Sequence, residues 1–186
     1  YMNQIMFFDS TIRDGSHAIK HQLTKENISD YCQSIDKTGM EVVIVGHGNG
    51  LGASSLQVGL SKLTDREMLT VAKQNLLKTK LGVFMIPGFG TIKDNLKPAL
   101  ELGADLVCIA SHCTEADITQ QHIEYGRQEE KDVYGVLMMY HMACKEKLLE
   151  EALKMQNYGA MGVILMDSAG ASIPEMVADT VQFLVK

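Results

Sequence analysis

The sequence lacks the features that mark membrane, exported and nucleic-acid-binding proteins. No apolar run is long enough to cross a bilayer, and no charged-then-apolar leader precedes the first strand-like segment. Basic residues are dispersed, and 17 Lys and Arg stand against 23 Asp and Glu for a net charge of −6. We therefore expect a cytoplasmic protein with no membrane partner and no nucleic-acid partner.

Cysteine is scarce, and its spacing argues against a disulfide framework. The four cysteines form no Cys-x-x-Cys pair, and three of them lie in or beside apolar segments. They are Cys32, Cys108, Cys113 and Cys144. This usage predicts buried thiols in a reducing compartment.

Strand-length apolar runs alternate with helix-period segments along the 186 residues, which is typical of repeated βα units around a parallel sheet. With 46% hydrophobic residues and no linker or low-complexity segment, residues 1–186 are expected to form a single domain. The expected strands are Ile5–Asp9, Glu41–Val45, Leu81–Ile86, Leu106–Ala110, Val133–Met139 and Val163–Met166. The expected helices are Lys25–Thr38, Asp65–Leu77, Ile92–Leu102, Glu115–Gln128, Lys145–Asn157 and Pro174–Val185.

Capping signals support these boundaries. Thr64 with Glu67 and Thr114 with Asp117 have the spacing of capping boxes. Pro174 suits a first helical position. Glycines are expected to end three helices in a left-handed conformation, namely Gly39, Gly103 and Gly159.

Two architectures accept serial βα units, an open doubly wound sheet and a (β/α)8 barrel, and six units are two short of a barrel. A dinucleotide site is not expected, because the first strand-to-helix turn lacks a glycine-rich phosphate loop. The glycine-rich run 46–52 follows a strand, but the next helix begins only near Asp65. That run is therefore interpreted as a loop bordering a pocket.

Polar residues collect where the predicted strands end, which is where βα folds place their active sites. These residues are Asp14, His17, His47, His112, His141, Asp167 and Ser168. Taken one at a time, each histidine is better explained as a satisfied structural residue than as a ligand, and His21 and His122 are interpreted in that way. Four histidines at strand ends favour a site.

The segment Arg13–His17 concentrates the chemistry. Its Arg, carboxylate and imidazole could clamp an anion, hold a divalent metal and move a proton, although a solvated polar turn after a strand is the plainer alternative. No His-x-His or His-x-x-x-His pair exists, so a complete metal site would need ligands from separate loops.

Eight segments together resemble the 4-hydroxy-2-oxovalerate aldolases, which are class II pyruvate aldolases of the HMG-CoA-lyase-like group of TIM barrels. The segments are Asp9–Gln22, Gly46–Gly48, Pro87–Gly88, His112–Asp117, His122–Tyr125, Leu137–Met139, His141–Met142 and Asp167–Gly170. The resemblance implies an α/β fold of the parallel (β/α) TIM-barrel type, with six of eight βα units present in this chain.

The resemblance also implies roles for individual residues. Asp14 would be a ligand of a divalent metal, most typically Mn2+, with Mg2+ and Co2+ as alternatives. Arg13 would stabilise the pyruvate enolate, His17 would be the general base, and Ser168 would hold the pyruvoyl part of a 2-oxo acid substrate. Cleavage would give pyruvate and a short aldehyde, which an acylating acetaldehyde dehydrogenase would take up.

Three positions depart from the family pattern. The family usually has an acidic residue where this chain has Ile44, an acidic residue where it has Asn49, and often Arg where it has Cys108. The family's His-x-His ligand pair and its Tyr acid would lie beyond Lys186. We therefore expect an N-terminal portion or truncated homologue that is metal-poor in isolation and closes its open edge by self-association as a homo-oligomer. The alternatives are an acyl synthase or lyase of the same group and a non-catalytic interaction domain derived from the barrel.

Overall fold

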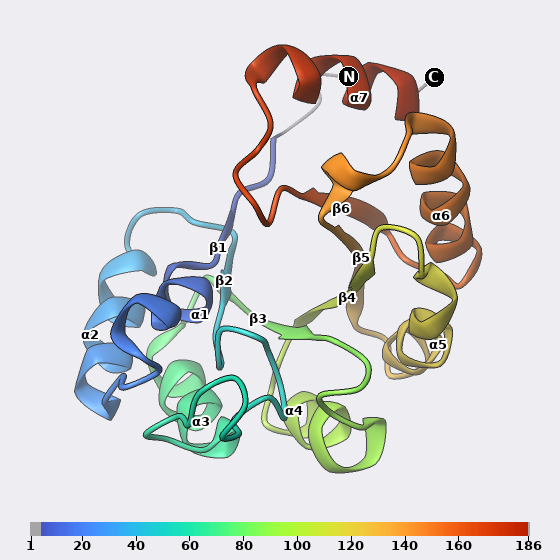
Figure 1. Ribbon diagram of the computed structural model, residues 1–186. Helices are drawn as coiled ribbons and strands as arrows, with labels where there is room; N and C mark the ends of the chain where they lie inside the picture. Colours follow the sequence, from blue (N-terminus) through green and yellow to red (C-terminus); the bar gives the residue numbers. More distant parts are fainter. Residues whose placement is uncertain (1–4, 186) are drawn as a thin grey trace. The chain divides into compact units, whose positions relative to one another are not determined.

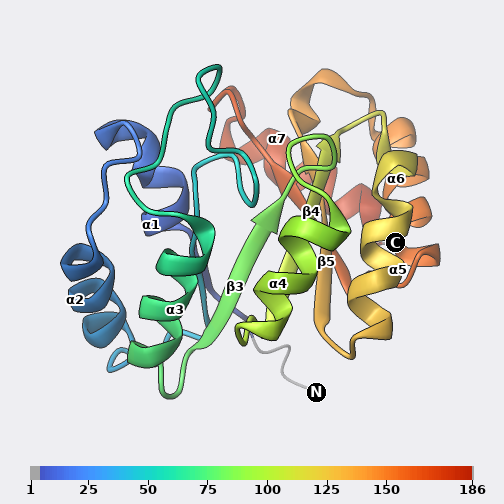
Figure 2. The same ribbon diagram turned by 90° about the horizontal axis from the view of Figure 1, so that it is seen from below.

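The computed structural model describes residues 5–185 (Figure 1). The contacts between residues divide the chain after Val107 into two compact units. In the first unit, β1 pairs in parallel with β2 and β2 pairs in parallel with β3. Its elements are β1 Phe8–Asp9, α1 Thr11–Asp14, η1 Gly15–Ile19, α2 Lys25–Ile35, β2 Val42–Ile44, α3 Asp65–Asn75, β3 Lys80–Met85, η2 Ile92–Leu96 and α4 Lys97–Glu101. Helices α2 and α3 lie side by side (Figure 2).

The second unit continues the alternation of strand and helix. Its strands follow chain order, β4-β5-β6, and β5 pairs in parallel with β6 from Tyr134 opposite Gly162 to Met138 opposite Met166. Its elements are β4 Leu106–His112, η3 Ala116–Thr119, α5 Gln120–Gln128, β5 Asp132–Met138, η4 Tyr140–Met142, α6 Lys145–Asn157, β6 Gly162–Met166 and α7 Pro174–Leu184. Strand β4 begins two residues before the division of the chain.

The predicted strands are all present. Strands β2, β3 and β4 are almost wholly buried, as their continuous apolar runs predict, whereas every residue of β6 is half-buried. The first strand is shorter than predicted and spans only Phe8–Asp9. The residues Ile5, Met6 and Phe7 lie before it and are exposed. The N–H of Phe7 donates to the Glu41 carboxylate at 3.1 Å rather than to the sheet.

Two predicted helices begin with a different turn. The segment predicted as one helix from Ile92 starts as a π turn and becomes α-helical at Lys97. Pro98 explains the break, because it lacks the N–H that an α-helix would bond to the carbonyl four residues earlier. The helix predicted from Glu115 starts as the 3-10 turn η3, whose first N–H, on Ala116, donates to the buried Glu151 carboxylate at 2.7 Å.

Most capping predictions are confirmed. Thr64 and Glu67 form the predicted capping box, and Pro174 is the first residue of α7. Gly39, Gly103 and Gly159 have φ values of 83°, 98° and 105°, in the left-handed region. The Thr114 prediction is wrong, because the Thr114 hydroxyl pairs with His112 Nδ1 at 2.9 Å and η3 has Glu115 at its N-cap. Within residues 5–185, each helix is too short or too polar to cross a membrane.

Candidate functional site

Arg13 is buried and held from three sides. It lies in α1, directly after β1, and its side chain is 6% exposed. Its Nη1 donates to the Gly48 carbonyl at 2.9 Å and lies 3.2 Å from Asp14 Oδ1. Its guanidinium carbon stands 4.5 Å from the centre of the Phe84 ring, within cation–π distance. The loop after β2 and the strand β3 thus fix a permanent positive charge at the end of β1.

His17 lies one turn further along, in η1, and belongs to a group of three imidazoles. The His17 and His21 rings meet edge to face with centroids 4.8 Å apart, and the His21 and His47 rings stack at 3.7 Å. His17 is exposed, whereas His21 and His47 are buried. The inner pair therefore supports a solvent-facing imidazole.

The protonation state of His47 follows from its hydrogen bonds. Its Nδ1 accepts from the Asn49 N–H at 3.0 Å, so its Nε2 carries the proton that it donates to the Gly59 carbonyl at 3.0 Å. Burial lowers the pKa of His47. Burial also lowers the pKa of His21, and the neighbouring His47 and His17 lower it further. Both inner rings are therefore neutral at pH 7.

Tight backbone turns follow β1 and bring Ser16 and His21 together. Ser16 Oγ donates to the Arg13 carbonyl at 2.7 Å and lies 2.9 Å from His21 Nδ1. Lys20 and His21 have φ values of 53° and 60°, a conformation that side chains rarely adopt. This strained pair of residues turns the chain so that the His21 ring reaches His47.

Asp14 was predicted to bind a divalent metal. Its side chain is 66% exposed, with one oxygen beside Arg13. Within residues 5–185, no group of three His, Cys, Asp or Glu side chains is placed to hold a metal ion. A divalent ion usually needs two or three protein ligands, so the described residues do not amount to a metal centre, and Asp14 supplies one carboxylate.

In the second unit, the residues after β5 and β6 form a polar group. Asp167 accepts hydrogen bonds from the N–H groups of Ala171 at 3.1 Å and Ser172 at 2.9 Å, and these bonds, the Ser172 bond foremost, lower its pKa. His141 Nδ1 lies 3.2 Å from Asp167 Oδ1. Ser168 is exposed, and its Oγ accepts from the Met139 N–H at 3.3 Å. Ser168 is thus held by the end of β5.

His112 and Cys113 do not form a nucleophile and base. The Cys113 sulfur lies 3.9 Å from His112 Nδ1, which pairs more closely with Thr114. Burial raises the pKa of the Cys113 thiol, so it stays protonated near neutral pH.

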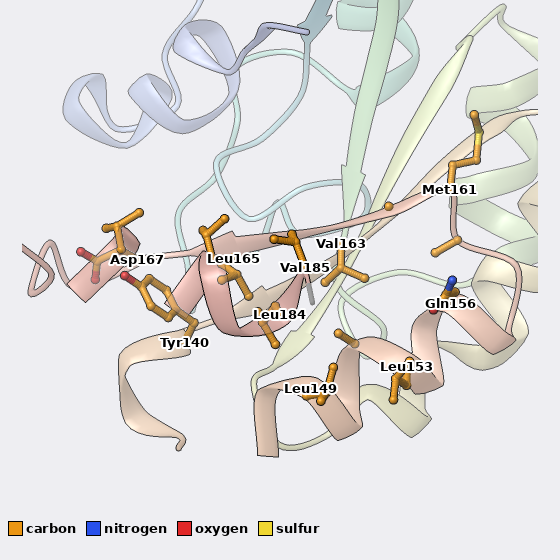
Figure 3. A pocket seen from close by; sticks show the side chains of 15 residues that line it. Tyr140, Leu149, Leu153, Gln156, Met161, Val163, Leu165, Asp167, Leu184 and Val185 are labelled. Carbon is orange, nitrogen blue, oxygen red and sulfur yellow. The ribbon is translucent and has the colours of Figure 1, made fainter. Parts of the chain in front are cut away.

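An apolar cavity of about 540 Å³ lies in the second unit between α6, β6 and α7. In Figure 3, Leu149 and Leu153 of α6 and Leu165 of β6 face the same space as Leu184 of α7. Asp167 and Tyr140 stand at one end of this space. The other lining residues are mostly apolar, with the Gln156 amide as a further polar group, so this cavity presents no fixed positive charge.

Sequence reasoning missed three neighbours of the predicted residues. Gly48 and Phe84 lie 35 and 71 positions from Arg13, and nothing in the sequence pairs them with it. His21 was interpreted as structural, yet its ring contacts His17. The signal that could have pointed to His21 is its position four residues after His17, which is close enough for contact through a tight turn.

Nearly the whole chain matches known proteins. The HMGL-like family model matches residues 4–186. The chain is 50% identical over 182 residues to the 4-hydroxy-2-oxovalerate aldolase of Pectobacterium atrosepticum, covering 98% of this chain and 53% of that protein. It is 54% identical over 170 residues to the 4-hydroxy-2-oxovalerate aldolase of Spirochaeta aurantia, covering 91% and 50%. The chain thus spans about half the length of these curated relatives.

Solved structures share the fold at low sequence identity. The N-terminal domain of a putative aldolase from Bacteroides vulgatus matches with a TM-score of 0.78 and 17% identity, covering 97% of this chain and 60% of that one. The carboxyl transferase domain of Rhizobium etli pyruvate carboxylase, solved with pyruvate and biocytin, matches with a TM-score of 0.78 and 13% identity, covering 98% and 34%.

These matches and the observed elements confirm an α/β fold of the parallel TIM-barrel type with six strands. The buried Arg and exposed His after the first strand are the polar groups that such a fold presents at its strand ends. The chain belongs to the HMGL-like family, and within it the resemblance to the 4-hydroxy-2-oxovalerate aldolases is confirmed.

Proposed function

We propose that this chain provides the charge-stabilising and proton-transferring part of an aldolase that cleaves 4-hydroxy-2-oxo acids such as 4-hydroxy-2-oxovalerate. One observation carries the proposal. Arg13, buried and fixed by Gly48 and Phe84, lies one helical turn from the exposed imidazole of His17. A fixed cation beside a general base is what an aldol cleavage requires. The curated relatives about 50% identical to this chain carry the name of that activity.

In the proposed reaction, His17 takes the proton from the 4-hydroxyl group of the substrate. The bond between C3 and C4 then breaks, the aldehyde leaves, and the electron pair moves into the enolate of pyruvate. The Arg13 guanidinium stabilises the negative oxygen, because it stays protonated throughout. A proton from water adds to C3 and completes pyruvate, and His17 releases its proton to water, which restores the base. Ser168 is proposed to bind the pyruvoyl group through its exposed hydroxyl.

The proposed cofactor is a divalent metal, Mn2+ or in its place Mg2+ or Co2+. In this chain, Asp14 would be the residue that holds the metal. The described residues supply that one carboxylate and no complete set of ligands. An acylating acetaldehyde dehydrogenase is proposed as the partner that consumes the aldehyde.

A chimera tests this function. This chain replaces the matching part of the Pectobacterium atrosepticum aldolase, and the purified protein is assayed with 4-hydroxy-2-oxopentanoate and Mn2+. We expect pyruvate and acetaldehyde in equal amounts. A folded chimera that releases no pyruvate, beside an active parent enzyme, would contradict the proposal and favour the non-catalytic domain.

A further inference from the structure

Gly48 touches both residues on which the proposed function depends. It lies in the loop between β2 and α3, and its carbonyl accepts the 2.9 Å hydrogen bond from Arg13 Nη1. A Cβ atom built on Gly48 would stand 2.3 Å from His17 Nε2, 2.5 Å from its Cδ2 and 2.6 Å from its Cε1. Such approaches are shorter than side chains tolerate, so the Nε2 edge of the His17 ring fills the place of the missing side chain.

The backbone of Gly48 does not itself call for glycine. Its φ lies outside the left-handed range, unlike that of Gly50 at +91° or Gly52 at +75°. An alanine therefore fits the local backbone, and the three atoms nearest to its methyl group all belong to the His17 ring. Because that ring is exposed at the end of a rotatable side chain, it can swing toward solvent when it is pushed.

We propose that Gly48 is a positioning residue for the two catalytic groups. Its carbonyl accepts a hydrogen bond from the Arg13 guanidinium, and its absent side chain leaves room for the His17 imidazole to stay against His21, with its Nε2 edge beside Gly48. One residue of the loop between β2 and α3 thereby fixes the positions of both the base, His17, and the charge-stabilising group, Arg13. This inference deepens the proposed function and rests on it.

The proposal separates the two roles of Gly48. Gly48→Ala keeps the carbonyl and therefore the bond to Arg13, but it places a methyl group where the His17 ring lies. The variant should fold as the parent does, since Gly→Ala at a compatible φ also restricts the unfolded chain. In the proposed reaction it should lower kcat far more than it raises KM.

Nuclear magnetic resonance on the full 186-residue chain, with labelled histidine, tests the placement without any catalytic assay. The ring protons of His17, assigned through His17→Ala, should show cross-relaxation with those of His21 in the parent chain. Gly48→Ala should abolish that cross-relaxation while keeping the thermal unfolding midpoint. Gly15→Ala is the matched control, because a Cβ at Gly15 meets no atom within 4 Å. It should keep the cross-relaxation.

A Gly48→Ala chain that retains the contact between His17 and His21 would overturn the positioning role, whatever the chimera does in the pyruvate assay. Conversely, loss of this contact in a protein whose chimera never releases pyruvate would uphold the placement and refute the aldolase function. A double variant completes the test. In the His17→Ala background, Gly48→Ala should leave the remaining histidine spectrum unchanged, since the ring that it displaces is gone.

Discussion

Arg13 combines a backbone hydrogen bond, a carboxylate contact and an aromatic face, and this combination needs a planar guanidinium. Lysine offers a point charge on a flexible stem and cannot repeat the set. We expect Arg13→Lys to lower kcat/KM of the chimera by about 10²-fold, the usual cost of removing one charge-stabilising donor. Arg66→Lys, at an exposed position of α3, is the control and should leave kcat/KM unchanged. Equal activity of the two variants would refute the role of Arg13.

The stacked pair His21 and His47 makes the stability of the fold depend on pH. Burial lowers both pKa values below 6.5, so the unfolded chain binds more protons than the folded chain in the range below that value. The free energy of unfolding should therefore fall as the pH is lowered from 7.5 to 5.5. The loss for each ring is about 1.4 kcal/mol for every unit that separates its folded and unfolded pKa.

Urea unfolding at several pH values measures this slope. His47→Gln should flatten it, because one of the two rings no longer titrates. His112→Gln, which replaces a histidine outside the stacked pair, should keep the slope of the parent chain. A His47→Gln chain with an unchanged slope would show that the pH dependence comes from other groups.

Helix α3 depends on its first turn. Thr64 Oγ1 accepts from the Glu67 N–H at 3.2 Å, and the Glu67 carboxylate accepts from the Thr64 N–H at 3.0 Å, which satisfies two N–H groups that the helix leaves free. We expect Thr64→Ala to lower the free energy of unfolding by about 1 kcal/mol. Thr70→Ala, inside the same helix, should change it by less than about 0.5 kcal/mol. Similar values for both would mean that the cap is not what stabilises α3.

The elements that the sequence predicts well are those whose signals are local. The helix predicted at Lys145–Asn157 is observed with those bounds, since its apolar spacing and its polar flanks lie within one segment. The first turns of the segments at Ile92 and Glu115 differ from the prediction. Pro98 decides the first from within its own segment, whereas the distant Glu151 decides the second through tertiary structure. The same limit applies to the site. Arg13, Asp14 and His17 stand in one short segment, whereas Gly48 and Phe84 reach Arg13 through tertiary structure alone.

The apolar face of α7 bears on the behaviour of the whole molecule in solution. Val177 and Val181 of α7 are 44% and 42% exposed, Val185 just after the helix is 76% exposed, and all three line the open cavity between α6, β6 and α7. Such a face favours burial against another surface. We expect this chain to self-associate with rising concentration, as measured by size-exclusion chromatography with light scattering. Val181→Lys should weaken the association, whereas Gln182→Lys, which adds the same charge at an exposed polar position, should not. A chain that stays monomeric at all concentrations would contradict this expectation.

The central claim is that His17 is the base of an aldol cleavage, and the rate of pyruvate release by the chimera tests it most directly. His17→Ala should reduce kcat by about 10²- to 10⁴-fold, the usual contribution of general base catalysis, while the chimera stays folded. His122→Gln, which replaces the histidine of α5 interpreted as structural, provides the comparison for loss of a histidine elsewhere. Turnover by His17→Ala at the rate of the unaltered chimera would contradict the account.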